Sequence, residues 1–216
     1  MSPVVIAVDG PAAAGKGTLA RRLAAALGLP YLDPGLLYRA VGRRVLDRGA
    51  DPHDPVAAER EARALTPADL DRPDLRGPDA DKAASAVAAI PAVRAALLDF
   101  QRSFGATKGA VLDGRDIGTV VFPNAQAKLF VTASPEERAR RRWLELRARG
   151  IAADRAQVEA EIRARDAQDA SRPVAPLVPA ADAMLLDTTA LDADAAFAAA
   201  LELVQARIAA IPADCT

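Results

Sequence analysis

Short apolar runs alternate along this chain with longer segments in which apolar residues recur every three or four positions. The first run, Val4 to Val8, has no polar alternation, which is typical of a strand buried on both faces of a parallel sheet. Similar short runs predict strands at residues 30–33, 110–112, 127–131 and 183–187. Because helical segments separate these runs, the pattern favours an α/β fold, with three α/β/α layers around a five-stranded parallel sheet.

Residues that start or end helices mark most of the segments between these strands. Gly28 is suited to end the first helix, and Ser134 with Glu137 three positions later resembles a capping box. The segment 51–81 is rich in Pro, Asp and Arg, so we expect an irregular insertion with one short helix and without three regular strands. The predicted helices cover residues 18–27, a segment from about 36, residues 57–65, residues 83–104 with a new start at 91, a segment from 134, residues 154–169 and residues 195–208.

Composition narrows the class of protein without indicating its chemistry. The 216 residues are 51% hydrophobic and suffice for one domain, residues 1–216, around a single core. Because 28 Lys and Arg balance 29 Asp and Glu, for a net charge of −1, no global positive field indicates a nucleic-acid partner. No apolar run approaches the roughly 20 residues that a membrane span requires, and no signal peptide is evident. We therefore expect a cytoplasmic monomer without a nucleic-acid or membrane partner.

Two residue types are too scarce to build a site. Cys215 is the one cysteine, which excludes an intramolecular disulfide framework and a cysteine-based zinc site. His53 is the one histidine, and its Asp and Pro neighbours predict a solvated loop residue. A histidine cluster is thereby excluded, and a Ser-His-Asp hydrolase is disfavoured.

A glycine-rich segment joins the first predicted strand to the first predicted helix. Gly10 and Gly15 allow the backbone to curl so that its N–H groups point at an anion, which the helix N-terminus also faces. Lys16 is the predicted catalytic lysine, with a charge that reaches the terminal phosphates of a nucleoside triphosphate. Gly17 occupies the usual hydroxyl position, so Thr18 is predicted to join the shell of the Mg²⁺ that accompanies ATP. The predicted ATP ligands are Gly10, Pro11, Ala12, Ala13, Ala14, Gly15, Lys16, Gly17 and Thr18.

Three classes of protein share such a phosphate-binding loop: switch GTPases, mechanical ATPases and small kinases. The chain has no Asn-Lys-x-Asp stretch that would read guanine. The predicted strand before Asp113 continues into Gly114-Arg115-Asp116, which puts an arginine where a second phosphate could bind. Phosphoryl transfer between two phosphate-bearing substrates gathers negative charge that a protein neutralises with Mg²⁺, Lys and Arg. Arginines suited to this role are Arg39, Arg115, Arg138, Arg140, Arg141, Arg142, Arg165 and Arg172.

Late in the chain, Arg165, Asp169 and Arg172 are spaced to share one face of a helix. From this spacing alone, a solvated row of ion pairs is favoured over a binding site. The choice between the two interpretations depends on whether other parts of the chain indicate a phosphate-bearing acceptor.

Four segments of the sequence together are similar to those of the bacterial cytidylate kinase family, and the resemblance extends over nearly the whole chain. These segments are Asp9–Thr18, Tyr38-Arg39, Asp113–Pro123 and Arg172–Asp182. The resemblance implies a P-loop kinase domain with a monophosphate-binding region at residues 39–105 and a lid region at residues 135–172. It also implies transfer of the γ-phosphoryl group of ATP to CMP or dCMP, giving ADP and CDP or dCDP.

The same resemblance implies roles for individual residues. The implied CMP-binding residues are Arg39, Ser85, Arg94, Asp113, Arg115, Asp116, Arg165, Asp169 and Arg172. Among them, the phosphate ligands would be Arg39, Arg115 and Arg172, the cytosine readers Ser85, Arg94 and Asp116, and the ribose ligands Arg165 and Asp169. The catalytic residues would be Lys16, Arg115 and Arg172, and the lid arginines Arg138, Arg141 and Arg142. A carboxylate such as Asp116 can accept from the N4 amino group of cytosine, whereas uracil has an oxygen at that position.

One residue departs from the family pattern. Pro34 lies between Asp33 and Gly35, where the family usually has a small hydroxyl residue. Because proline lacks a hydroxyl and fixes φ, we expect weaker CMP binding than a hydroxyl residue would give.

Two other functions stay open: a kinase for another small acceptor, such as UMP, AMP or shikimate, and a regulatory nucleotide-binding module. ATP turnover that is independent of any added monophosphate would indicate the module.

Overall fold

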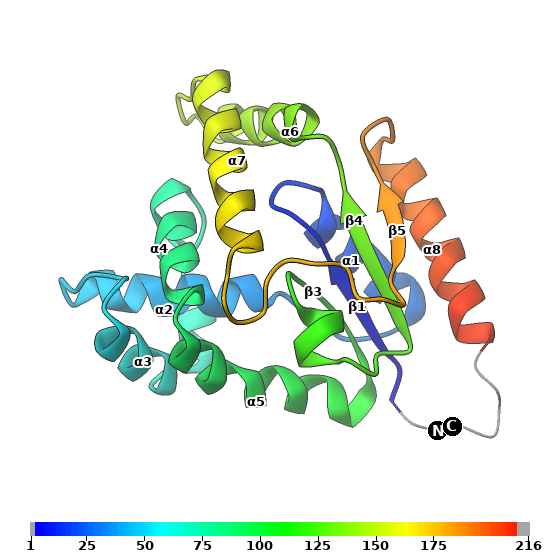
Figure 1. Ribbon diagram of the computed structural model, residues 1–216, viewed down its shortest axis with the longest axis horizontal. Helices are drawn as coiled ribbons and strands as arrows, with labels where there is room; N and C mark the ends of the chain where they lie inside the picture. The colour runs from blue at the N-terminus through cyan, green and yellow to red at the C-terminus, as the bar shows by residue number, and fades with distance from the viewer. Residues whose placement is uncertain (1–2, 211–216) are drawn as a thin grey trace. The chain divides into compact units, whose positions relative to one another are not determined.

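The computed structural model describes residues 3–210, and Cys215 lies outside them. The chain divides into two compact units. Unit 1 comprises Met1–Tyr31 and Thr107–Thr216, and unit 2 comprises Leu32–Ala106. Unit 1 is therefore built from two separate stretches of chain, with unit 2 inserted between them (Figure 1).

A five-stranded, all-parallel sheet has the strand order β2-β3-β1-β4-β5. Its strands are β1 (Val5–Asp9), β2 (Tyr31–Leu32), β3 (Ala110–Gly114), β4 (Ala127–Thr132) and β5 (Met184–Asp187). Asp9 is in register with Gly114 of β3 and Phe130 of β4, so these strands end at one edge of the sheet. In open parallel sheets ligands bind at this edge. The predicted α/β fold and its five-stranded parallel sheet are confirmed.

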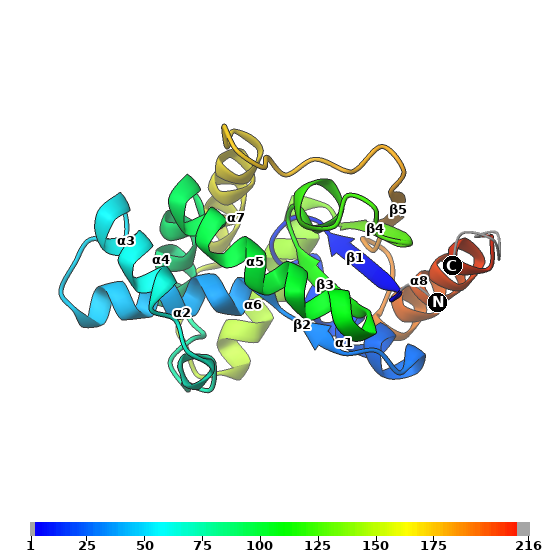
Figure 2. The same ribbon diagram turned by 90° about the horizontal axis from the view of Figure 1, so that it is seen from below.

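Two helices of unit 1 cover the same face of this sheet, as Figure 2 shows. They are α1 (Lys16–Leu27) and α8 (Ala193–Ala209), and they share a core with β1, β3 and β4. Leu23 of α1 and Val204 of α8 are both fully buried in that core. Burial of one such side chain contributes roughly 1.5–3 kcal/mol. This core holds the beginning of α1 at the sheet edge where β1 ends.

A helical pair in unit 1 follows β4. It consists of α6 (Pro135–Ala148) and α7 (Arg155–Ala170), which pack through a small cluster that includes Leu146 and Ile162. Ser134 caps α6 by accepting from the N–H of Glu137 at 3.2 Å, which confirms the predicted helix start. The reciprocal bond of the expected capping box is not formed, because the N–H of Ser134 donates to Oγ1 of Thr189 at 2.9 Å. Between β3 and β4 lies η2 (Ile117–Val121), a π-helical turn that the sequence did not predict.

Unit 2 consists of helices around its own core. They are α2 (Pro34–Asp47), α3 (Pro55–Arg63), the short 3₁₀ helix η1 (Pro67–Leu70), α4 (Pro78–Ala88) and α5 (Pro91–Lys108), which extends just past Ala106. Leu37, Val41 and Val87 are buried in that core. Within residues 3–210 no single helix is long and apolar enough to span a membrane; α4 and α5 meet those criteria only when joined, and they are bent by 98°.

The segment 51–81 is more regular than its composition suggests. It contains α3, η1 and the start of α4 at Pro78, so the expectation of an irregular insertion with one short helix is wrong. No strand lies in these residues, as expected. Pro55, Pro78 and Pro91 each stand at the first position of a helix, where the missing N–H of proline costs nothing. His53 is 77% exposed in the turn before α3, as predicted.

Candidate active site

The loop between β1 and α1 has the backbone geometry of an anion-binding cradle. Gly10 has a φ of +147°, and a Cβ there would lie 1.9 Å from the carbonyl oxygen of Val131, so only glycine fits. Ala13, with a φ of +59°, and Gly15, with a φ of +88°, add two left-handed turns. Left-handed residues of this kind, with Gly15 as the N-cap residue of α1, allow successive N–H groups to converge on an anion at the helix N-terminus. The segment predicted to bind the triphosphate of ATP therefore has a shape suited to phosphate.

Lys16 lies across this loop and is buried, with 6% of its surface exposed. Its Nζ donates to the carbonyl oxygen of Pro11 at 2.7 Å. Burial and the nearby Arg115 guanidinium lower the pKa of Lys16 to about 7, although the carboxylates of Asp113 and Asp9 oppose this shift. Lys16 is thus a cation held among other cations, a position that a phosphate would stabilise. Phosphate binding beside Nζ would raise its pKa and keep it protonated.

A buried carboxylate, Asp169 of α7, holds two arginines of unit 1. Asp169 is 0% exposed, and its Oδ2 accepts from Nε of Arg115 at 2.8 Å. Its Oδ1 lies 2.5 Å from Nη2 of Arg172. Burial would raise the pKa of Asp169, but the charges of Arg115 and Arg172 outweigh it and lower the pKa. Arg165 adds positive charge to the surroundings of both Asp169 and Lys16.

The geometry corrects what spacing alone indicated for Arg165, Asp169 and Arg172. The helix α7 ends at Ala170, so Arg172 lies beyond it rather than on a continuous helical face. Asp169 and Arg172 are buried, which excludes a solvated row of ion pairs. Because Asp169 contacts two guanidinium groups, the structure makes it a counterion for Arg115 and Arg172.

Two further carboxylates stand where β3 ends. Asp113 Oδ1 accepts from the hydroxyl of Tyr31 at 2.6 Å, and its Oδ2 lies 3.7 Å from where a Cβ of Gly17 would be. Asp116 is buried at the beginning of η2. Asp113 therefore faces the phosphate-binding loop.

Oxygen donors near the loop fit Mg²⁺, a cation that binds carboxylate, hydroxyl, water and phosphate oxygens. Thr18 is exposed in the first turn of α1, and Asp113 lies beside the neighbouring Gly17. Among residues 3–210 no group of three or more His, Cys, Asp or Glu side chains could hold a metal by itself. The donors present thus suit an ion that arrives with a nucleotide and keeps several water ligands.

The three predicted lid arginines have different surroundings. Arg138 donates to both carboxylate oxygens of Asp166, at 3.0 and 2.6 Å, and to the carbonyl oxygen of Ala12 at 3.2 Å. Arg141 donates to the hydroxyl of Thr188 at 3.0 Å and lies 3.9 Å from where a Gly15 Cβ would be. Arg142 pairs with Glu145 on the same helix at 2.9 Å. Arg138 and Arg141 therefore connect α6 to the phosphate-binding loop and its surroundings.

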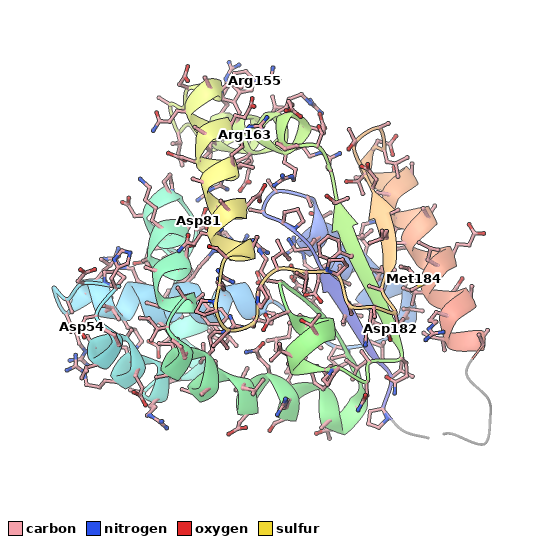
Figure 3. All side chains as sticks on the ribbon, viewed as in Figure 1. Asp54, Asp81, Arg155, Arg163, Asp182 and Met184 are labelled. Atoms are coloured by element: carbon pink, nitrogen blue, oxygen red, sulfur yellow. The ribbon has the colours of Figure 1, made fainter. Side chains whose placement is uncertain are left out.

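Unit 2 carries the other predicted acceptor ligands. Nε of Arg39 on α2 donates to Asp81 on α4 at 3.0 Å (Figure 3 labels Asp81). This approach depends on Gly42, where a Cβ would lie 2.8 Å from Cβ of Ala83.

The cytosine readers predicted in this unit lie on α4 and α5. Ser85 is buried on α4. The guanidinium of Arg94 on α5 lies 5.9 Å from the ring centroid of Tyr38 and 3.4 Å from the carbonyl oxygen of Ala88. Stacking on an aromatic ring limits the freedom of a guanidinium.

Several residues that shape the site had no predicted role. Asp9 binds two backbone N–H groups of η2, Tyr31 binds Asp113, and Thr188 binds Arg141. Asp9 stands at the beginning of one of the four family-like segments, so its position could have indicated a role in the site. Its partners could not be predicted, because they lie more than a hundred positions away. The sequence carries no comparable signal for Tyr31 or Thr188.

A strand, a left-handed phosphate cradle, a buried lysine and clustered arginines define a P-loop phosphotransferase. The chain belongs to the cytidylate kinase family, because the family model described as "Cytidylate kinase" matches residues 6–206. Cytidylate kinases of Acidiphilium cryptum and Granulibacter bethesdensis are 66% and 65% identical to it over 202 residues. These matches cover 94% of this chain and 95% and 97% of the relatives. The family match and these relatives confirm the expected cytidylate kinase function, and no comparison favours another acceptor or a regulatory module.

Two solved structures share the fold at low sequence identity. An uncharacterised protein from Eubacterium ventriosum has a TM-score of 0.55 at 13% identity, covering 96% of this chain and 99% of that one. A Thermus thermophilus protein has a TM-score of 0.50 at 23% identity, with the same coverage. At these identities the two structures support the fold alone.

Proposed function

We propose that the protein transfers the γ-phosphoryl group of ATP to CMP or dCMP, with the described residues in the roles expected from the sequence. The observation that carries the proposal is the cationic cluster of unit 1, in which Arg115 and Arg172 bind the buried carboxylate of Asp169 and the charge of Arg115 also reaches Lys16. Two phosphate-bearing substrates bring more negative charge than a single loop would neutralise. Two buried or partly buried guanidinium groups near a buried lysine suit the point at which those phosphates meet.

The reaction needs few chemical groups from the protein. An ionised phosphate oxygen of CMP attacks the γ-phosphorus of ATP, a new P–O bond forms, and the bond to the β,γ-bridging oxygen breaks. The electrons of that bond stay with ADP, so no general base is required. Lys16 binds the transferred group, and Arg115 and Arg172 orient the attacking phosphate. Catalysis consists mainly of positioning and charge neutralisation.

Thr18 would hold the Mg²⁺ that accompanies ATP, and the ion would supply further positive charge to the phosphates. Unit 2 contributes Arg39 to the acceptor phosphate, and Ser85 and Arg94 to the base. Residues 39–105, which fall within unit 2, form the proposed monophosphate-binding region, and residues 135–172 form the proposed lid. Arg138, Arg141 and Arg142 belong to this lid, which excludes water from the transferred group. The proposal also includes that the protein is a monomer, lies in the cytoplasm and acts in pyrimidine metabolism.

The cytosine-reading role of Asp116 predicts a change in acceptor preference. In Asp116→Asn, the amide can still accept one hydrogen bond, but it also presents a donor that suits the O4 of uracil. We expect the preference for CMP over UMP to fall about 10-fold, because a buried mismatch of this kind costs about 1–3 kcal/mol. ADP release measured with CMP, dCMP, UMP, AMP and shikimate gives that ratio and tests the proposed function directly.

The control for this change is Asp194→Asn, an exposed aspartate on α8 that pairs with Arg22. It should leave the acceptor ratios at the values of the unaltered protein. An unchanged ratio in Asp116→Asn would remove the base-reading role. Equal ADP release with and without any monophosphate would contradict the proposed function as a whole.

The departure at Pro34 predicts a gain in acceptor binding. Pro34 is the first residue of α2, after Asp33, which caps the helix by accepting from Leu36. Pro34→Ser keeps the cap and restores the hydroxyl that the family usually has, so the KM for CMP is expected to fall about 10-fold. Initial rates over a range of CMP concentrations measure it. Pro55→Ser, at the first position of α3 after a capping Asp54, is the matched control and should not change KM.

A further inference from the structure

The carboxylate of Asp9 is buried directly before the phosphate-binding loop. Asp9 is the last residue of β1 and is 6% exposed. Its Oδ1 accepts from the backbone N–H of Ile117 at 2.8 Å, and its Oδ2 accepts from the N–H of Gly118 at 2.7 Å. The two oxygens thus bind neighbouring amides of a single short segment, the beginning of η2.

The segment that Asp9 holds comes immediately after two proposed CMP ligands. Asp116 precedes η2 as its N-cap residue, but its own side chain does not form the capping hydrogen bond. Asp9, 108 residues before Ile117, binds those N–H groups instead. With the backbone fixed at Ile117 and Gly118, the preceding residues, Arg115 and Asp116, have fewer accessible orientations.

The close approach of this carboxylate depends on glycine. A Cβ at Gly118 would lie 3.3 Å from Asp9 Oδ2 and 3.0 Å from Cδ of Lys128. A Cβ at Gly114 would lie 2.8 Å from the side chain of Ile117. The backbone on both sides of Arg115 and Asp116 is therefore shaped so that Ile117 and Gly118 reach the Asp9 carboxylate.

Burial of the Asp9 carboxylate costs free energy. Burial raises the pKa of Asp9 to about 6, although the N–H groups of Gly118 and Ile117 act in the opposite direction. A neutral side chain would avoid much of that cost. Only a carboxylate, however, has two oxygens that both accept, which is what two parallel N–H donors require.

We infer that Asp9 is a positioning residue for acceptor recognition: its carboxylate holds Ile117 and Gly118 so that Arg115 and Asp116 face CMP. The inference rests on the proposed function, because it takes those two residues as CMP ligands. Asp9 contacts no substrate in this account. It connects the strand that leads into the ATP-binding loop to the segment that reads the acceptor.

Asp9→Asn is the decisive change, because the side chain keeps its shape but faces one N–H donor with its own NH₂ group. One of the two hydrogen bonds is lost, and a donor is set against a donor. The KM for CMP should rise about 10-fold, and the preference for CMP over UMP should fall, because Arg115 and Asp116 would no longer be held in one orientation. The KM for ATP should change by less than about 2-fold. Amide exchange measured by NMR should accelerate at Ile117 and Gly118.

Three further variants complete the test. Asp9→Ser keeps one acceptor and should give an effect between those of the unaltered protein and Asp9→Ala, provided that each folds as judged by circular dichroism. Asp192→Asn is the matched control, because Asp192 also accepts from two backbone N–H groups, those of Asp194 and Ala195. It lies at the exposed start of α8 and should leave both KM values unchanged.

The outcomes separate this inference from the proposed function. If Asp9→Asn leaves amide exchange at Ile117 and Gly118 unchanged, or raises both KM values equally, the positioning role is overturned. If Asp116→Asn leaves acceptor preference unchanged, the proposed base reading fails, whatever Asp9→Asn does. Faster exchange together with a selective rise in the KM for CMP supports the positioning role.

Discussion

Replacement of Lys16 by alanine is expected to lower kcat about 10³-fold, the effect of removing a preorganised cation from a developing phosphoryl charge. Nζ of Lys16 is buried and bound to the carbonyl oxygen of Pro11 at 2.7 Å, and a neutral water molecule in its place would carry no charge to the phosphates. Burial and the Arg115 guanidinium lower the pKa of Lys16 to about 7, and a bound phosphate would offset both effects. Single-turnover rates at saturating ATP and CMP measure the loss without a contribution from weaker binding.

A second buried lysine provides the matched control. Lys128 of β4 also donates to a proline carbonyl five positions before it, that of Pro123, and pairs with Asp182 at 2.8 Å. Lys128→Ala should lower the free energy of unfolding but keep kcat within a few-fold of the unaltered protein. Near-normal turnover in Lys16→Ala would refute the assignment of the ATP-binding loop.

Asp169→Asn should have the second-largest effect, on stability and activity together. The substitution leaves the guanidinium groups of Arg115 and Arg172 without the carboxylate that now lies 2.8 and 2.5 Å from them. Removing one partner of a buried ion pair costs about 3–5 kcal/mol. We expect a loss of this order in the free energy of unfolding, measured by urea denaturation, and a fall in kcat/KM for CMP.

Glu61→Gln distinguishes a loss of stability from a loss of function. Glu61 is a buried carboxylate of unit 2, and it pairs with Arg44, Arg48 and Arg60. Its removal should lower stability comparably but leave the KM for CMP unchanged. If both variants were equally active, Asp169 would be a structural counterion without influence on the acceptor.

The sequence predicted the strands well and the proline-rich segment poorly, for a physical reason. Continuous apolar runs such as 110–112 have few alternatives to a buried strand, and the strand there extends only two residues further, to Gly114. Proline, in contrast, both interrupts helices and starts them. In the segment 51–81 that ambiguity hid the start of α4 at Pro78, five residues before the predicted one.

For the candidate site, the sequence predicted local features and missed distant contacts. The phosphate-binding loop follows from its own glycines, because their φ values and the adjoining helix are local properties. The contact of Arg115 with Asp169 joins residues 54 positions apart, and that of Asp9 with Ile117 joins residues 108 positions apart. No periodicity encodes such pairs. The resemblance to a family drew attention to Arg115 and Asp169, but it assigned Asp169 to the ribose and gave Asp9 no role.

The insertion of unit 2 into unit 1 has a consequence for the order in which the chain folds. The central pairing of the sheet joins Val5 to Ala110, so its formation closes a long loop at a large entropic cost. Unit 2 has its own apolar core, and its collapse would bring Leu32 and Ala106 closer together before β1 and β3 meet. The kinetic barrier to sheet assembly then depends on a core that contributes no strand pairing between them. Cavities introduced at Val41 or Val87 would accordingly slow the pairing of β1 with β3 as well as weaken their own helices.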